Sequence, residues 1–493
     1  MNLLGVETAN CDSPAYCSPR YIAQLPMLKL VQDCYEGQEA IARAGARYLP
    51  SFEGESVRNY NERLKASTFW NAYRRTVVGL VGMVYRRNPV LESDVPDKIR
   101  KACENIDLMG THLDVFSKDA FQWSIAEGHS AILVDMPPKI VGKYPAVTNR
   151  NTFGRRPYYS MIRKQQIINP IVEQVDGVSK LTQVTIRESI TRRKGKYGEE
   201  PVECYRVLWP GGWELFEQAE GHQPESKGGG KTSLSRIPLA IISTGAIAPW
   251  ISRPSLLDLA HENLRLYRLQ SALDCILQVA NVPVMVEIQG DNDSLDGQIT
   301  AGALTEKPGK KPRRVISPKT IYTVGHGGDL KYVQHDGKAI DKAQEEIATS
   351  KRNIATLGLT ILQNSQGGPQ GASTATEEVF EREMETSELA GMARTLEDGL
   401  EQALEFHAEY EQLDSGGSVK VNRDFTRINL DGAMVIALAT VVEKGGMSLE
   451  TMYGIFEQGS LVGSDFDPNE ELQKILSEHK ILEAIRKPQP AAA

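Results

Sequence analysis

Cysteine is scarce in this sequence, and no cysteine is placed to bind a metal. The six cysteines among 493 residues form no Cys-x-x-Cys pair and do not cluster with a histidine. In a chain of this length, that pattern indicates scattered reduced thiols in a cytosolic-type compartment. We therefore expect no zinc site, and the sequence predicts no other cofactor.

Long apolar runs and an excess of positive charge are also missing. The longest uncharged apolar runs, residues 76–85 and 432–442, fall far short of the ~20 residues that a membrane-spanning helix needs. Residues 1–5 do not open a signal peptide, so we expect no membrane partner. The 56 Lys and Arg against 64 Asp and Glu give a net charge of −8, which excludes a broadly cationic DNA-binding protein.

Motifs that carry catalysis are absent or incomplete. Three glycines precede Lys231 and Thr232, but Glu225 stands where a phosphate-binding loop needs its first glycine, so a loop between strands is the better prediction. Residues 128–131 lack the second glycine of a nucleophile elbow. The eight histidines show no metal-ligand spacing. We therefore expect that the chain is not an enzyme.

The composition is that of a soluble protein with a real core, at 41% hydrophobic and 24% charged residues. Its N-terminal third has helical spacing, with helices expected near 28–42, over 57–84 and over 112–127. From about 156 to 244 the pattern changes to period two and is rich in β-branched residues, with a hairpin-type turn at 210–212. This predicts an antiparallel β region inserted between helices.

Two long helices are predicted over 254–280 and 338–362. Each carries a narrow apolar stripe in a three-four rhythm, with charged residues elsewhere, which suits a packed bundle of long helices. The residues expected to pack in these stripes include Leu266, Leu269, Leu273, Ile340, Ile347 and Ile354.

The segment between these helices, 281–337, reads as strand and turn and contains a basic cluster. Residues 306–319 contain one acid, Glu306, and six basic residues: Lys307, Lys310, Lys311, Arg313, Arg314 and Lys319. The cluster is suited to nucleic-acid phosphates or to an acidic protein partner, and a solvated loop is the simpler alternative. It lacks the interleaved aromatics that stack single-stranded bases.

The second long helix is followed by an uncharged, glycine-rich segment, 363–373, which predicts a flexible connection. Its polar residues are Gln363, Asn364, Ser365, Gln366, Gln370 and Ser373. A long helix is expected next, over 374–413, with twelve acidic and two basic residues. Shorter helices are predicted over 433–443 and from 448 to about 459.

This succession resembles the core of tailed-bacteriophage portal proteins, the head-to-tail connector family. The order of its parts is helix, basic strand-rich insert, helix, uncharged glycine loop and long acidic helix. Local stretches are similar to a portal subgroup long described as of unknown function: residues 48–56, 60–64, 71–82, 373–377 and 421–425. The likeness covers most of residues 20–460.

The resemblance implies an α+β portal-type fold. It assigns residues 1–253 to a wing with a helical part and an antiparallel β part, to which a long kinked acidic helix, 374–430, returns. It assigns 254–280 and 338–362 to a two-helix stem, 281–337 to a small strand-rich clip and 363–373 to a tunnel loop. Residues 431–493 would form a short helical crown.

The resemblance also implies a function. Portal proteins form rings, typically of twelve subunits, at one capsid vertex, and double-stranded DNA passes through the ring during packaging and ejection. The implied partners are other copies of the chain, this DNA, the major capsid protein, the terminase large subunit, and neck and tail adaptors. The implied location is the virion, after assembly in the host cytoplasm.

The chemistry of the predicted loop agrees with a channel. Because each Lys or Arg contact to phosphate adds salt-sensitive affinity, an uncharged loop at 363–373 would touch sliding DNA without holding it. Whether the basic residues of 281–337 meet DNA, terminase or an adaptor stays open. The alternatives are a nucleic-acid-processing enzyme subunit, for which no phosphate loop or nuclease motif is found, and a non-viral helical structural protein.

Overall fold

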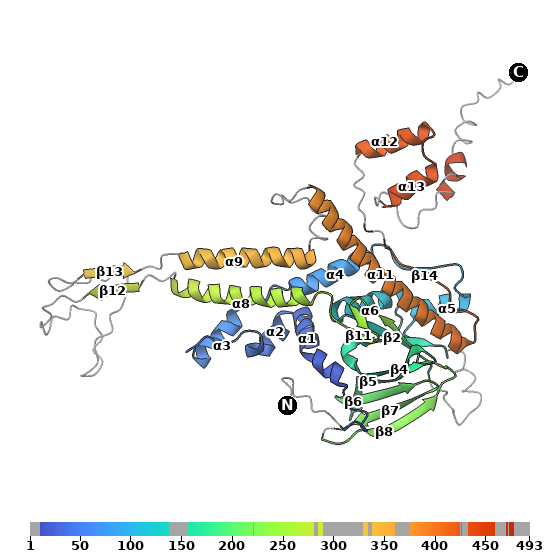
Figure 1. Cartoon of the computed structure of the whole chain (residues 1–493), viewed down its shortest axis with the longest axis horizontal. Helices are drawn as coiled ribbons and strands as arrows, with labels where there is room; N and C mark the ends of the chain where they lie inside the picture. The colour runs from blue at the N-terminus through green and yellow to red at the C-terminus, as the bar shows by residue number, and fades with distance from the viewer. Residues whose placement is uncertain are drawn as a thin grey trace. The chain divides into compact units, whose positions relative to one another are not determined.

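The computed structural model describes the chain in two compact units. The first contains Met1–Glu36, Asn71–Ala260 and Thr356–Ala493, and the second contains Gly37–Trp70 and His261–Ala355. Helices combine with antiparallel sheets, so the fold class is α+β, as the sequence predicts (Figure 1). The described residues are 10–137, 155–219, 221–280, 284–288, 329–333, 338–359, 375–423, 425, 432–458, 470–471 and 473–477.

The helices near the N-terminus are shorter than the sequence predicts. The expected helix over 57–84 is two helices, α3 (Val57–Ala66) and α4 (Ala72–Val84). The Ser67 hydroxyl donates to the Arg63 carbonyl (2.7 Å) where α3 ends, and the Asn71 side chain accepts from the Arg74 N–H (2.9 Å) where α4 begins. A pattern of apolar residues cannot show such local side-chain bonds.

The expected helix near 28–42 is likewise divided, by a glycine. Gly37 has a φ of 95°, a conformation that other residues rarely adopt, and it separates α1 (Pro19–Glu36) from α2 (Gln38–Ala44). The prediction over 112–127 is confirmed by α6 (Leu113–Glu127), which leads into strand β2 (Ser130–Asp135). Three short helices complete this part of the chain: η1 (Gly45–Arg47), α5 (Asp97–Ala102) and η2 (Cys103–Asn105).

A three-stranded sheet lies at the centre of the first unit. Strand β2 pairs antiparallel with β3 (Tyr158–Arg163) on one side and with β9 (Leu239–Ile242) on the other. The long helix α11 (Ala375–Glu411) lies against β2 and β9. Gly399 of α11 allows this close approach, because a Cβ there would lie 2.6 Å from Cγ1 of Ile242.

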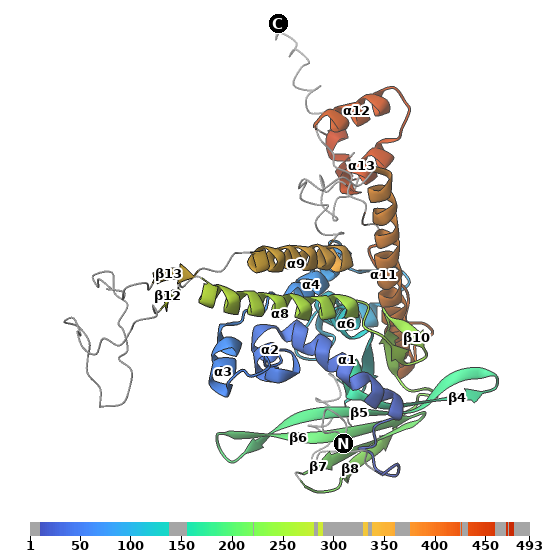
Figure 2. The same cartoon turned by 60° about the vertical axis from the view of Figure 1, so that its left-hand side comes forward.

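A five-stranded antiparallel meander packs against the three-stranded sheet, as Figure 2 shows below α6. Ile167, Val184 and Leu208 of the meander share one buried cluster with Leu133 and Leu239 of the smaller sheet. The antiparallel β region that the sequence predicts is therefore confirmed. The strands are β4 (Ile167–Val175), β5 (Val178–Lys194), β6 (Gly198–Trp209), β7 (Gly212–Gln218) and β8 (Glu225–Lys231), with η3 (Lys164–Gln166) before them.

The glycines at 228–230 lie in strand β8, so the expected loop at this position is wrong. Strand β8 pairs with β7, with Trp213 opposite Gly230. A Cβ at Gly230 would lie 2.8 Å from Nε1 of Trp213, and one at Gly229 would lie 2.8 Å from the Trp213 carbonyl oxygen. The run of glycines therefore makes room for the Trp213 indole and its backbone rather than for a phosphate.

The second unit is built on two long helices. Helix α8 (Leu257–Ala280), which belongs to this unit from His261 onward, and α9 (Lys338–Ile354) lie side by side in both Figures 1 and 2. In sequence they are separated by two paired antiparallel strands, β12 (Val284–Ile288) and β13 (Asp329–Val333). Both predicted helices are present, but the second is α-helical only to Ile354 and continues as a π-helix, η4 (Ala355–Leu359).

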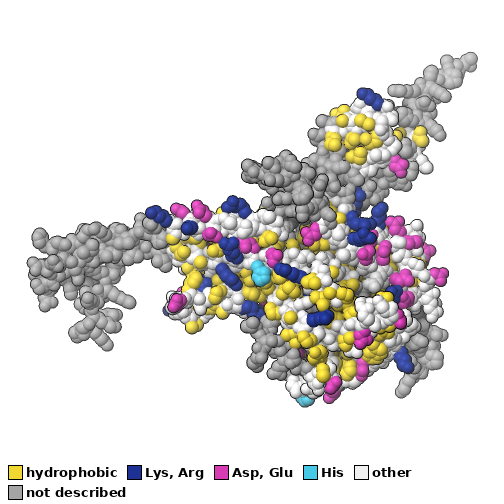
Figure 3. All heavy atoms as spheres, viewed as in Figure 1, with side chains coloured by type: hydrophobic (Ala, Val, Ile, Leu, Met, Phe, Trp, Pro, Cys, Tyr) yellow, Lys and Arg dark blue, Asp and Glu magenta, His cyan; other side chains and the backbone are white. Residues whose placement is uncertain are grey.

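The remaining elements are short. Strand β1 (Val90–Leu91) pairs with β14 (Val419–Lys420), and β10 (Ala246–Ala248) pairs with β11 (Ile251–Ser252). Helices α12 (Gly432–Glu443) and α13 (Leu449–Gln458) pack on each other, and Figure 3 shows hydrophobic side chains on their surface. Within the described ranges, no helix is both long enough and apolar enough to cross a membrane.

Candidate functional site

Two of the three residue sets that the sequence singles out lie outside the described residues. These are the six basic residues between 307 and 319 and the six polar residues between 363 and 373. Their roles stay predictions. The third set, on the paired helices α8 and α9, is described, and the candidate site is built from it.

Polar side chains join α8 to α9. Nη2 of Arg265 lies 2.8 Å from Oε2 of Glu346, and Nδ2 of Asn353 donates to Oε1 of Glu262 (3.3 Å). Residues near the start of α8 therefore meet residues near the end of α9, and the two helices run antiparallel. Because the Arg265–Glu346 pair is about half exposed, it contributes to the register of the helices more than to their stability.

The predicted packing residues are buried to different degrees. Leu266, Ile347 and Ile354 are buried within the single chain, whereas Leu269, Leu273 and Ile340 are only half-buried. Ile276 and Leu277, further along α8, are half-buried as well. The C-terminal half of α8 thus keeps a row of apolar side chains that the described chain covers only in part.

A buried arginine anchors the segment before α3. Arg63 makes a bidentate ion pair with Glu55, with Nε to Oε1 at 2.8 Å and Nη2 to Oε2 at 2.7 Å. Nη2 also donates to the Pro50 carbonyl (2.8 Å), and the guanidinium lies 4.1 Å from the centre of the Phe52 ring. Hydrogen bonds from Arg63 hold the pKa of the Glu55 carboxyl below its ordinary value.

The same segment is tied to α8. Nη1 of Arg63 lies 3.4 Å from the Ser271 hydroxyl oxygen, which in turn lies 2.7 Å from the Ser67 hydroxyl oxygen. Nε of Arg268 donates to the Tyr48 carbonyl (2.7 Å). The stretches 48–56 and 60–64, which carry the family resemblance, therefore form a brace on the first long helix.

The sequence does not predict this bracing role, because neither of its contacts joins residues that are neighbours on one helix. Glu55 and Arg63 flank Ser56, the N-cap of α3, whose side chain accepts from the Asn59 N–H. Glu55 and Arg63 are eight residues apart, beyond the three- or four-residue spacing at which side chains meet on a helix, so their pairing depends on the path of the turn before α3. That the pair would be buried against α8 depends on a contact across more than 200 residues of sequence.

Acidic residues of α11 bind a returning stretch of backbone in the first unit. Glu397, Glu401 and Glu405 are spaced four residues apart and lie on one face of the helix. They accept hydrogen bonds from the backbone N–H groups of Val421 (3.0 Å), Val419 (3.1 Å) and Gly416 (2.9 Å), respectively. We call this arrangement the carboxylate ladder.

Two further acids of α11 pair with basic side chains of the same unit. Glu409 pairs with Arg236, and Glu411 pairs with Lys98. Several acids of this helix are therefore engaged inside the chain, a structural use that the sequence did not reveal. The periodicity of glutamates at every fourth position was the available signal.

The cysteines and acids of the described residues form no chemical centre of their own. All six thiols are unpaired, and burial raises the pKa of Cys103 to about 12. Within the described ranges, no group of three or more His, Cys, Asp or Glu side chains is placed to hold a metal ion.

Comparisons with known proteins give one family match. Residues 255–411 match a family described as "Domain of unknown function (DUF4055)", which spans the chain from α8 to the end of α11. No curated protein matches the chain.

Among solved structures, the chain is similar to three from gene transfer agent (GTA) particles, each at 11% identity. For the neck of the native GTA particle computed with C12 symmetry, the TM-score is 0.41 over 78% of this chain and 89% of that chain. The TM-score is 0.39 for the native GTA virion and 0.41 for the neck of the empty GTA particle computed with C6 symmetry. Each of these two matches covers 77% of this chain and 86% of the matched chain. A likeness this loose supports no conclusion about this chain.

Proposed function

We propose that this chain is the portal subunit of a tailed bacteriophage or a related particle. Copies of it form a ring, expected to contain about twelve subunits, at one capsid vertex. Double-stranded DNA passes through the ring during packaging and ejection. The ring contacts the capsid protein and is the docking platform for the terminase and for neck or tail adaptors.

The observation that carries this proposal is the paired arrangement of α8 and α9 in its sequence context. Two long antiparallel helices, separated in sequence by a strand pair and followed by a long acidic helix, match the order of stem, clip, stem and long helix in the portal resemblance. The stretches that carry the resemblance brace the first of these helices through Arg63 and Ser271. A stem helix that is fixed near its middle by these contacts suits a channel wall.

The half-buried row on α8 supports assembly into a ring. Leu269, Leu273 and Ile276 lie on neighbouring turns of the helix and are only partly covered in one chain. Burying such side chains stabilises an interface by roughly 25 cal/mol for each Å² of apolar surface removed from water. In the proposed ring, a neighbouring copy covers this row.

Electron microscopy of the purified full-length chain tests the proposal. Negative-stain images should show rings with a central opening wide enough for duplex DNA. Compact particles of a single copy would contradict the proposal, and nucleotide hydrolysis by the purified chain would favour the alternative of a nucleic-acid-processing enzyme.

Deletion of residues 363–373 tests the channel role separately. We expect rings to assemble as before, while particles made with the deleted chain contain less DNA. A variant in which the same segment is replaced by a Gly/Ser linker of equal length serves as a control for connection length. Unchanged genome content in the deletion particles would contradict the proposed role of this segment.

A further inference from the structure

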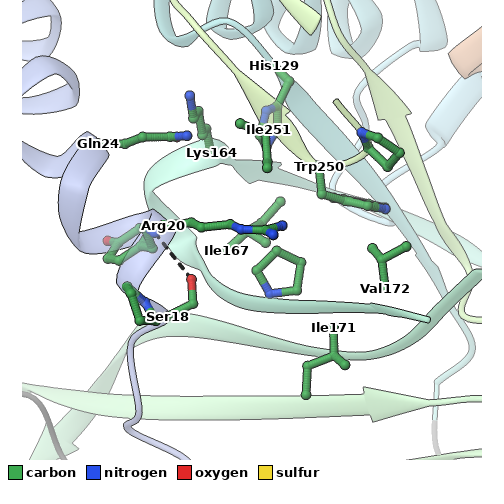
Figure 4. A pocket seen from close by; sticks show the side chains of 14 residues that line it. Ser18, Arg20, Gln24, His129, Lys164, Ile167, Ile171, Val172, Trp250 and Ile251 are labelled. Atoms are coloured by element: carbon green, nitrogen blue, oxygen red, sulfur yellow. Dashed lines mark hydrogen bonds between the residues drawn. The ribbon is translucent and has the colours of Figure 1, made fainter. Parts of the chain in front are cut away.

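A pocket of about 360 Å³ opens in the first unit. It lies between the N-terminal end of α1, the start of β4 and the β10–β11 hairpin (Figure 4). Ile167, Ile171, Val172 and Trp250 are among the apolar residues that line it. The pocket is therefore large enough for a small organic group and is lined on one side by apolar side chains.

The charged side chains that line the pocket are all basic. Arg20 and Lys164 line it, and among its described lining residues there is no aspartate or glutamate. Figure 4 shows Arg20 extending into the pocket between Ile167 and Trp250. Arg20 is exposed, whereas the Lys164 side chain is buried and donates to the Ser252 carbonyl.

The nearest acid behind Lys164 already has a partner. Glu127 is buried and forms an ion pair with Arg163, whose guanidinium lies 3.5 Å from the centre of the Trp123 ring. Glu127, Arg163 and Lys164 together carry one net positive charge, and Arg20 adds another. Burial lowers the pKa of Lys164 to about 8, so the amine is mostly protonated at neutral pH.

The N-terminus of α1 adds to the positive character of the pocket. Pro19 and Arg20 begin this helix of 18 residues, Ser18 precedes it, and all three residues line the pocket. The Ser18 hydroxyl oxygen accepts from the Tyr21 N–H (3.2 Å), which leaves the hydroxyl proton available to another group. Helix N-termini favour anions because of the aligned peptide dipoles. Pro19 has no N–H and the Tyr21 N–H is bonded to Ser18, so this end of α1 offers its dipole and the Ser18 hydroxyl proton.

A buried histidine contributes an unused polar atom. His129 lines the pocket and is 2% exposed, and its Nδ1 lies 2.7 Å from the Ser252 hydroxyl. Within the described part of the chain, its Nε2 has no hydrogen-bond partner. When Nδ1 accepts from Ser252, the ring proton is on Nε2, which is then an unsatisfied donor beside the pocket.

We propose that this pocket binds an oxyanion, a carboxylate or a phosphate, carried on a small apolar group. Arg20, Lys164 and the first turn of α1 attract the negative charge, and Trp250 with the isoleucines contacts the apolar part. The two cations and the unused imidazole donor all favour this ligand, and no carboxylate of the described lining competes with it. The site is independent of the proposed channel.

Isothermal titration calorimetry of the full-length chain with four probes tests this site. Benzoate and phenyl phosphate carry both parts of the expected ligand, inorganic phosphate carries only the anion, and benzyl alcohol carries only the apolar ring. We expect benzoate or phenyl phosphate to bind at least ~10-fold more tightly than either partial probe. The tighter of the two identifies the anion as a carboxylate or as a phosphate ester.

Arg20→Met removes the exposed cation without disturbing a buried contact, and Arg75→Met, at an exposed position on α4, is the matched control. We expect Arg20→Met to weaken binding of the preferred probe ~10-fold or more, and Arg75→Met to leave it unchanged. Equal binding to wild type and Arg20→Met would overturn the proposal. Failure of both complete probes to bind, or equally tight binding of a partial probe, would overturn it as well.

Discussion

Arg63 and Glu55 form a bidentate ion pair in which both side chains are less than a tenth exposed, at 4% and 9%. The pair connects α3 to the turn before it, and the same guanidinium reaches Ser271 on α8. A single arginine thus holds together the turn, the helix and the long helix that we assign to the stem.

We expect Arg63→Met to lower the thermal unfolding midpoint by several degrees, because it leaves the buried Glu55 carboxylate without its partner. Arg63→Lys should lower the unfolding midpoint nearly as much, since an ammonium cannot make the bidentate contact or stack on Phe52. The control is Arg58→Met, which breaks the exposed Arg58–Glu62 pair on the same helix. Equal midpoints for Arg63→Met and Arg58→Met in differential scanning calorimetry would contradict the bracing role.

The carboxylate ladder gives a second prediction. Glu401→Ala removes the acceptor for the Val419 N–H, and leaving such a group unsatisfied costs about 1–3 kcal/mol. Glu401→Gln keeps an acceptor oxygen at this position, so its free energy of unfolding should fall much less. Hydrogen exchange measures the effect directly, since the amide of Val419 should exchange faster in the alanine variant. Unchanged exchange there would show that the ladder does not hold this segment.

Substitutions at buried and half-buried positions of α8 should affect folding and assembly differently. Leu266 is fully buried, and Leu266→Ala should cost about 2–5 kcal/mol of stability in the chain itself. Leu273 is half-buried, so Leu273→Ala should change the stability of the isolated chain less and shift the assembly toward smaller species. Analytical ultracentrifugation with matched circular dichroism distinguishes the two effects. Intact assembly of Leu273→Asp would place this row outside any subunit interface.

Two buried histidines predict a loss of stability in acid. Burial lowers the pKa of His129 to about 3 and that of His407 to about 4, against an ordinary value near 6.5. Below pH 6.5 the unfolded chain binds these protons and the folded chain does not, so stability falls as the pH drops toward 4. At pH 5 each histidine accounts for a loss of about 2 kcal/mol.

Urea unfolding between pH 7.5 and 5 measures this loss. His407→Phe keeps a ring at this position, which packs against Tyr159, and removes one titrating group. Its stability should fall less steeply below pH 6.5 than that of the wild type, whatever its stability at pH 7.5. An identical slope would mean that His407 is protonated in the folded chain.

The elements that the sequence predicts correctly are those with a regular repeat of apolar residues. Apolar repeats over many turns place α6, α8, α9 and α11, and period two with a Pro-Gly turn places the β6–β7 hairpin. The errors arise where a few side chains override the pattern. Asn71 and Gly37 break expected helices, and Trp213 lies over the glycines of an unexpected strand.

The contacts that give the sites their chemistry were harder to predict. The stretch around Arg63 carries part of the portal resemblance, but the burial of Arg63 against Ser271 depends on tertiary structure. In the sequence, Glu397, Glu401 and Glu405 indicate only an acidic helix, whereas in the structure they bind backbone N–H groups of a later segment. Likewise, Arg20, His129 and Lys164 are far apart in sequence, and only the fold brings them to one pocket.

The most direct test of the account is the mass of the purified full-length chain in solution. Mass photometry should find one dominant species at roughly twelve times the 54.5 kDa of a single chain. A chain that stays at 54.5 kDa, or that stops at a dimer across the accessible concentrations, would contradict the claim that its function depends on a closed ring.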